Sequence, residues 1–136
     1  MKTRPKITRI DGEPKEMMPG RRGWRLPLVG PEDGARNVDV HVNILKAYSG
    51  PGPTHYHAEA ENIYIVIEGT VEVIIEGKKY LANAGDVAFI PPGLHHSAAT
   101  AGDKPARIIE IYSPPISTPS GRDFHIVSGG YKEGLK

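Results

Sequence analysis

Residues 50–69, GPGPTHYHAEAENIYIVIEG, decide the fold of this chain. The stretch opens with a turn rich in glycine and proline and reaches two histidines, His55 and His57, that are separated by one residue. Because residues i and i+2 of a strand point to the same side, both imidazoles can approach one point. The run from Asn62 to Glu68 is rich in β-branched residues and Gly69 ends it, so the stretch predicts a histidine pair followed by a strand.

Short strands are predicted on both sides of this stretch. Between residues 38 and 44, valine and isoleucine alternate with Asp39, His41 and Asn43, which is the period of a half-buried strand. Further strands are expected at 71–75, 87–90, 97–100, 107–112 and 124–127, with a hairpin turn at 76–79. Sixteen glycines and thirteen prolines indicate frequent turns, and no segment predicts a helix. The pattern indicates an all-β sandwich or small barrel.

The two ends of the chain are expected to be irregular arms. Prolines recur throughout residues 1–34 and prevent a helix of useful length, so this segment is predicted to be an N-terminal arm. Prolines are again frequent after Tyr112, and residues 114–136 form the predicted C-terminal arm. The barrel is therefore placed at residues 35–113.

Composition excludes several kinds of site and partner. The chain has no cysteine, so disulfides, thiolate nucleophiles and cysteine-based zinc sites are absent. The net charge is +1, and the cluster of Arg21, Arg22 and Arg25 is interpreted as solvated surface, so no nucleic-acid partner is expected. The charged first residues lack the apolar stretch of a secretory signal, and no apolar run could span a bilayer. We therefore expect a cytoplasmic protein without a membrane partner.

A later segment supplies a third histidine. Residues 85–100, GDVAFIPPGLHHSAAT, place a Pro-Pro-Gly turn before His96, and such a turn fixes the direction of the backbone and can aim the side chain inward. Strand alternation sends the neighbouring His95 the opposite way. His55, His57 and His96 could therefore converge on one metal ion.

Together the two segments resemble the paired motifs of the cupin family, over about residues 38–112. The family's first motif is G-x5-H-x-H-x3–4-E-x6-G and its second is G-x5-P-x-G-x2-H-x3-N. Gly85, Pro91, Gly93 and His96 match the second motif, whereas Thr100 stands at the asparagine position. The resemblance implies a single-domain double-stranded β-helix, or jelly-roll barrel. It implies less about activity, because this fold hosts many functions.

The position of the motif carboxylate is ambiguous. Counting forward from His57 reaches Glu61, whereas counting back from Gly69 reaches Asn62. We favour the backward count, because the face of a strand pins its register while the preceding turn can vary in length. By that count Asn62 and Tyr64 point into the barrel, and a neutral amide oxygen replaces the usual carboxylate.

The expected cofactor is a divalent transition metal ion, with iron, zinc, nickel, copper and manganese as candidates. It would be held by the three histidines and by Asn62 or Glu61. Three imidazoles and an amide oxygen would hold hard, carboxylate-preferring ions less well. In the alternative, the barrel contains no metal and the histidines are hydrogen-bonded inside it.

Two further side chains have alternative interpretations. Tyr64 could serve as a catalytic acid–base group beside the metal, or it could be a buried aromatic residue whose hydroxyl is satisfied. His41 lies on the polar face of its strand, where a surface position is favoured over a role as a hydrogen-bond donor inside the cavity.

Two functions are compatible with these residues. The first is a small metal-dependent enzyme acting on a small oxygenated molecule, for which the resemblance implies a dioxygenase-like oxidoreductase, an isomerase or a lyase. Three-histidine iron sites among family members that cleave carbon–carbon bonds with oxygen slightly favour the dioxygenase. The second is a non-catalytic module that binds a small ligand or a metal, which the missing carboxylate favours. The resemblance also implies a homodimer.

Overall fold

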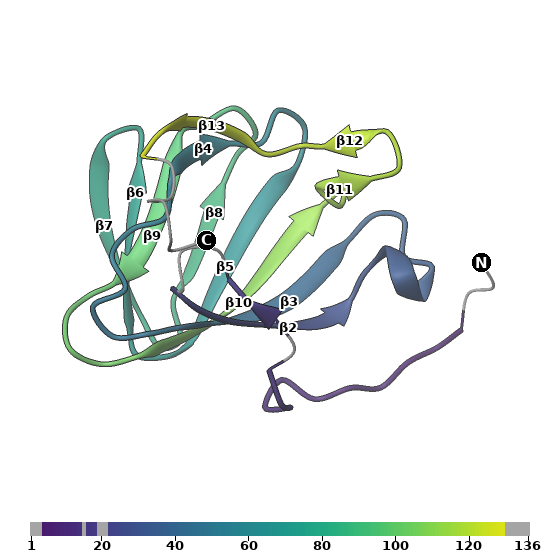
Figure 1. Ribbon diagram of the computed structural model, residues 1–136, viewed down its shortest axis with the longest axis horizontal. Helices are drawn as coiled ribbons and strands as arrows, with labels where there is room; N and C mark the ends of the chain where they lie inside the picture. Colours follow the sequence, from purple (N-terminus) through teal and green to yellow (C-terminus); the bar gives the residue numbers. More distant parts are fainter. Residues whose placement is uncertain (1–3, 15, 19–21, 130–136) are drawn as a thin grey trace.

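The protein consists of two antiparallel β-sheets that lie face to face (Figure 1). The computed structural model describes residues 4–14, 16–18 and 22–129. The strand order is β1-β2-β3-β10-β5-β8 in one sheet and β13-β4-β9-β6-β7 in the other, and β11 and β12 form a separate ribbon. The strands are β1 (Glu16–Met17), β2 (Gly23–Val29), β3 (Asp39–Leu45), β4 (Thr54–Tyr56), β5 (Glu61–Glu68), β6 (Thr70–Ile75), β7 (Lys78–Asn83), β8 (Val87–Ile90), β9 (His96–Thr100), β10 (Ala106–Ser113), β11 (Ser117–Thr118), β12 (Gly121–Arg122) and β13 (His125–Ser128).

The apolar core fills one end of the space between the sheets. Buried residues of β5 and β10, including Val66 and Ile108, pack against Val71 and Val73 of β6. A second apolar cluster forms around Val42 of β3 and the leucines of β2. Burial of these side chains supplies the main driving force for folding. The other end of the interior is lined by polar and aromatic side chains, and the candidate site lies there.

The N-terminal segment differs from the irregular arm that the prolines predict. Residues 23–29 form β2, which pairs antiparallel with β3 along most of its length. Pro27 lies outside the pairing of β1 with β2, which covers Trp24 and Arg25 in the described part of the chain, and proline is tolerated where a strand is unpaired on one side. A 3₁₀ turn, Pro31–Asp33, follows β2. Within the described ranges, no helical segment has the length and apolar character needed to cross a membrane.

Candidate metal centre

His55, His57 and His96 come together between β4 and β9. His55 lies on β4 and pairs in register with His96, the first residue of β9. One ring nitrogen from each of the three histidines lies within 4.8 Å of the others. The convergence that the two sequence segments predict is therefore present in the fold.

Each of the three rings is held by a hydrogen bond from Nδ1 to a main-chain carbonyl oxygen. The N···O distances are 2.9 Å from His55 to Pro53, 2.7 Å from His57 to Asp123 and 3.0 Å from His96 to Leu94. A carbonyl can only accept, so each Nδ1 carries the hydrogen and each Nε2 of a neutral ring has a free lone pair. This arrangement leaves three nitrogen lone pairs available at one site.

Three polar atoms in this region are buried without a hydrogen-bond partner among the described residues: Nε2 of His57, Nε2 of His96 and Oδ1 of Asn62. Unpaired buried polar atoms are costly, and each one needs an explanation. All three atoms are lone-pair donors in the ring tautomers deduced above. A bound cation would accept a lone pair from each of these atoms. The two imidazole nitrogens and the amide oxygen therefore fit a divalent transition metal ion.

Glu61 and Asn62 occupy opposite faces of β5. Asn62 is 0 % exposed, on the buried face that it shares with Tyr64, whereas Glu61 is exposed at the start of the strand. The orientation agrees with the count back from Gly69. Asn62 also pairs in register with Tyr112 of β10, whose ring lies 5.0 Å from that of His57. Asn62 is therefore a neighbour of the residue that contacts His57.

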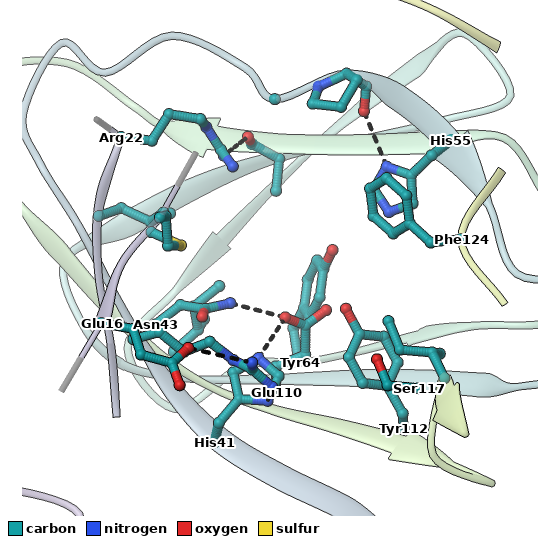
Figure 2. Close-up of a pocket in the computed structure, with 18 of the residues that line it drawn as sticks. Glu16, Arg22, His41, Asn43, His55, Tyr64, Glu110, Tyr112, Ser117 and Phe124 are labelled. Atoms are coloured by element: carbon teal, nitrogen blue, oxygen red, sulfur yellow. Dashed lines mark hydrogen bonds and ion pairs between the residues drawn. The ribbon is translucent and has the colours of Figure 1, made fainter. Parts of the chain in front are cut away.

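A cavity of about 650 Å³ opens beside His55. Figure 2 shows Glu110, His41 and Asn43 on one wall and His55 with Phe124 across from them. The ring of Phe124 stacks on His55 with centroids 4.2 Å apart. This volume is typical of sites for drug-sized molecules.

The Tyr64 hydroxyl projects into the same cavity (Figure 2). Burial, with a smaller contribution from the negative charge of Glu110, raises the pKa of Tyr64 well above its usual value. The hydroxyl is therefore protonated at neutral pH and can donate a hydrogen bond.

His41 lies inside the barrel, so the surface position favoured from the sequence is wrong. Its side chain is buried, and its Nε2 lies 3.0 Å from Oε1 of Glu110. Burial alone would lower the pKa of His41, but its hydrogen bonds to Asp39 and Glu110 outweigh burial and raise it. The strand predicted over residues 38–44 is present as β3, but its polar face points inward because this end of the barrel is polar.

Glu110 is a functional candidate that the sequence did not reveal. It lies in an apolar-looking segment, RIIEIY, where either alternating face could be the buried one. The structure buries Glu110 on the same face as Ile108 and Tyr112. Burial alone would raise the pKa of Glu110, but the hydrogen bonds and charge of His41 and the amide of Asn62 hold it far below its ordinary value.

The family model for the cupin domain matches residues 45–112. This chain belongs to the cupin family. Polyketide synthase CurC of Streptomyces cyaneus is 29 % identical over 125 residues, which cover 88 % of this cupin and 76 % of that protein. The chain spans only 50 % and 61 % of two other curated relatives, from Methanocaldococcus jannaschii and Aquifex aeolicus.

Two more comparisons concern the fold and one short segment of the chain. The polyketide cyclase RemF from Streptomyces resistomycificus superimposes with a TM-score of 0.74 at 21 % identity, over 94 % of this cupin and 88 % of that chain, which shows a shared fold. Quercetin 2,3-dioxygenase of Bacillus subtilis is 38 % identical over 45 residues, which cover 33 % of this cupin but 13 % of that enzyme.

Asp123 of the C-terminal segment connects the histidine site to the loop after β4. Its carboxylate accepts hydrogen bonds from three successive backbone nitrogens of residues 58–60, at 2.6, 3.0 and 3.1 Å. Its main-chain oxygen accepts from His57. Nothing in the sequence identified this residue, because its partners lie more than sixty positions away. The C-terminal segment of this cupin is therefore part of the site.

Replacing Asp123 with alanine is expected to destabilise this cupin by about 2 kcal/mol, because three backbone donors lose a charged acceptor. The same change should weaken zinc binding, because the segment that orients His57 is released. Urea denaturation and zinc titration measure the two effects. Asp103→Ala, on a different exposed loop, is the control. Equal unfolding free energies and equal zinc affinities for the two variants would contradict the role of Asp123 in holding the histidine site.

Acid is expected to destabilise the metal-free protein through His55. Burial lowers the pKa of His55 from 6.5 to about 4. As the pH falls from about 6.5, the unfolded chain takes up a proton that folded His55 refuses until about pH 4, so stability falls over that window. The ceiling of the effect is about 3 kcal/mol, at roughly 1.4 kcal/mol per pH unit.

The raised pKa of His41 acts in the opposite direction. Its contribution is complete below about pH 6.5 and is lost as the pH rises through the folded-state pKa. The two effects are separated by comparing wild type with His55→Gln in denaturant titrations at pH 7 and pH 4.5, both treated with a chelator. The variant should lose less stability on acidification. An identical loss in both proteins would refute the assignment to His55.

Proposed function

We propose that this cupin is a metal-dependent enzyme that acts on an enolisable carbonyl compound. The proposal rests on three buried atoms that offer lone pairs and have no hydrogen-bond partner among the described residues: His57 Nε2, His96 Nε2 and Asn62 Oδ1. His55 lines the neighbouring cavity together with Tyr64. Three neutral imidazoles and an amide oxygen suit zinc, nickel, copper or iron(II) better than harder ions.

The substrate class is inferred from the cavity and from the relatives. The cavity combines aromatic walls with a buried hydroxyl donor, which suits a flat molecule that carries carbonyl oxygens. CurC, matched over most of the chain, and RemF, which shares the fold, both have names that refer to polyketides. We therefore propose a polyketide-like substrate with several carbonyl groups. The dioxygenase-like reaction has narrower support, since that likeness covers 45 residues.

The chemistry follows from the positions of the side chains. A bound divalent ion would act as a Lewis acid that polarises a carbonyl oxygen. Tyr64 donates a hydrogen bond to a substrate oxygen that gains negative charge, and burial of the hydroxyl strengthens that interaction. Phe124, stacked on His55, offers an apolar surface to a planar substrate. These functions stabilise the enolate that forms when a base from solvent takes up the α-proton, a step that isomerisation and ring closure of carbonyl compounds can share.

Elemental analysis of protein purified without a histidine tag tests the metal site. About one equivalent of a transition metal per chain, either as purified or after loading with zinc, nickel or iron(II), is the expected result. Protein that takes up none of these metals under any loading condition would overturn the proposal.

Deuterium exchange tests the reaction class. In D₂O, metal-loaded protein should accelerate exchange of the acetyl hydrogens of 2′-hydroxyacetophenone, followed by proton NMR, relative to free metal ion at the same concentration. Tyr64→Phe should reduce this rate about 10- to 100-fold, because it removes one donor to the enolate oxygen. Binding of the ketone without any acceleration would favour the non-catalytic binding module instead.

A further inference from the structure

Glu110 lies at the centre of a buried hydrogen-bond network. It is 5 % exposed. Its Oε1 accepts from Nδ2 of Asn43 at 2.7 Å and lies 3.0 Å from Nε2 of His41, while its Oε2 accepts from Nδ2 of Asn62 at 3.0 Å. The carboxylate therefore has a donor on each oxygen, and one of these donors is the residue at the motif carboxylate position.

The amide of Asn62 can point only one way in this network. Its Nδ2 donates one hydrogen to Glu110 and the other to the main-chain oxygen of Ile111, at 3.1 Å. A flipped amide would turn Oδ1 toward these two acceptors and lose both hydrogen bonds. The observed orientation instead leaves Oδ1 buried without a partner among the described residues. Glu110 and the main-chain oxygen of Ile111 together determine which atom of Asn62 is free.

Asn62 is a strand neighbour of a residue that contacts the histidines. Asn62 pairs in register with Tyr112, and the Tyr112 ring packs 5.0 Å from the ring of His57. Donation of an amide hydrogen to a carboxylate also draws electron density onto the amide oxygen, because hydrogen-bonded groups polarise one another. The contact with Glu110 therefore makes Oδ1 of Asn62 a stronger metal ligand than the oxygen of an isolated amide.

We propose that Glu110 is a positioning residue for the metal centre. It holds Oδ1 of Asn62 toward the histidines, and it supplies, through one hydrogen bond, the negative charge that the motif carboxylate supplies by direct contact in the family pattern. The inference rests on the proposed metal site and deepens it. It assigns Asn62 and Glu110 one shared role, so substitutions at the two positions must be coupled.

The coupling is measured with four proteins: wild type, Asn62→Asp, Glu110→Gln and the double variant. Dissociation constants for zinc and for cobalt(II) are obtained by chelator competition. Glu110→Gln should weaken binding about 10- to 100-fold, as loss of a group that orients a ligand does. Asn62→Asp should also bind more weakly than wild type, although aspartate is ordinarily the better ligand, because it places two carboxylates side by side and removes the amide hydrogens.

The double variant moves the carboxylate from position 110 to position 62 and keeps one negative charge and one amide in the pair. It should bind zinc more tightly than either single variant, and the visible spectrum of its cobalt(II) form should differ from that of wild type because the oxygen donor has changed. Losses that simply add in the double variant would overturn the coupling.

The design remains decisive if a variant fails to fold. Asn62→Asp leaves Glu110 in place and tests the inference without the other variants. Tighter zinc binding by Asn62→Asp than by wild type would overturn the inference. A wild type that binds neither zinc nor cobalt(II) would remove the proposed metal site itself. A wild type that binds both metals, with a Glu110→Gln variant of equal affinity, would remove only the role of Glu110.

Discussion

The His96→Ala variant is expected to lose its bound metal. His96 supplies one of three convergent ring nitrogens, and its Nε2 has no other partner among the described residues. Removing a direct ligand should weaken zinc binding by more than about a hundredfold, beyond the range seen when a group that merely orients a ligand is lost. Metal content and chelator competition measure the loss. The fold should persist, because the hydrogen bond that is lost with the ring is the one that the main-chain oxygen of Leu94 accepts.

Two matched variants control for this result. His95→Ala removes the adjacent histidine, which is exposed, and should keep full metal content. Glu61→Ala removes the exposed carboxylate at the other candidate ligand position and should also bind normally. Loss of metal in Glu61→Ala, with retention in Asn62→Ala, would show that the forward count from His57 identifies the ligand.

The Gly69→Ala variant is expected to be severely destabilised. Gly69 has a φ of 79°, and an added Cβ would lie 2.6 Å from the carbonyl oxygen of Pro105. A left-handed backbone costs a non-glycine residue about 1–2 kcal/mol, and displacement of the neighbouring backbone adds to that cost. We expect a total loss on the order of 3 kcal/mol or more in the free energy of unfolding, measured by urea denaturation.

Gly77→Ala separates the two contributions. Gly77 has a φ of 80°, but an added Cβ there would meet no atom within 4 Å. It should therefore lose only the backbone cost of about 1–2 kcal/mol. Equal losses at the two positions would show that the close approach of the β5–β6 turn to residue 105 is unimportant.

The sequence predicted the parts of the fold that depend on local pattern. The all-β jelly roll and the family were correct, and so was the direction in which Asn62 and Tyr64 face, because strand alternation determines it. The strand at Gly23–Val29 was not predicted, because Arg25 and Pro27 interrupt its apolar pattern. The homodimer stays a prediction, which light scattering tests.

The site was only partly predictable, for a reason visible in its hydrogen bonds. The histidines carry motif spacing within short segments. Glu110 and Asp123 act through partners that lie 48 to 69 positions away in the chain, so no local pattern marks them. His41 shows the same limit, because a polar strand face points inward only when the rest of the barrel places polar groups opposite it.

The carbonyl acceptors of the three histidines have a consequence for how this protein can change over evolutionary time. Pro53, Leu94 and Asp123 hold the rings through main-chain oxygens, which every amino acid possesses. Single substitutions at Pro53 and Leu94 therefore leave the acceptor atoms in place as long as the local backbone path is kept, whereas at Asp123 the side chain also anchors that path. Mutational drift can alter the walls of the cavity, and with them the choice of ligand, while the ring orientations are inherited unchanged.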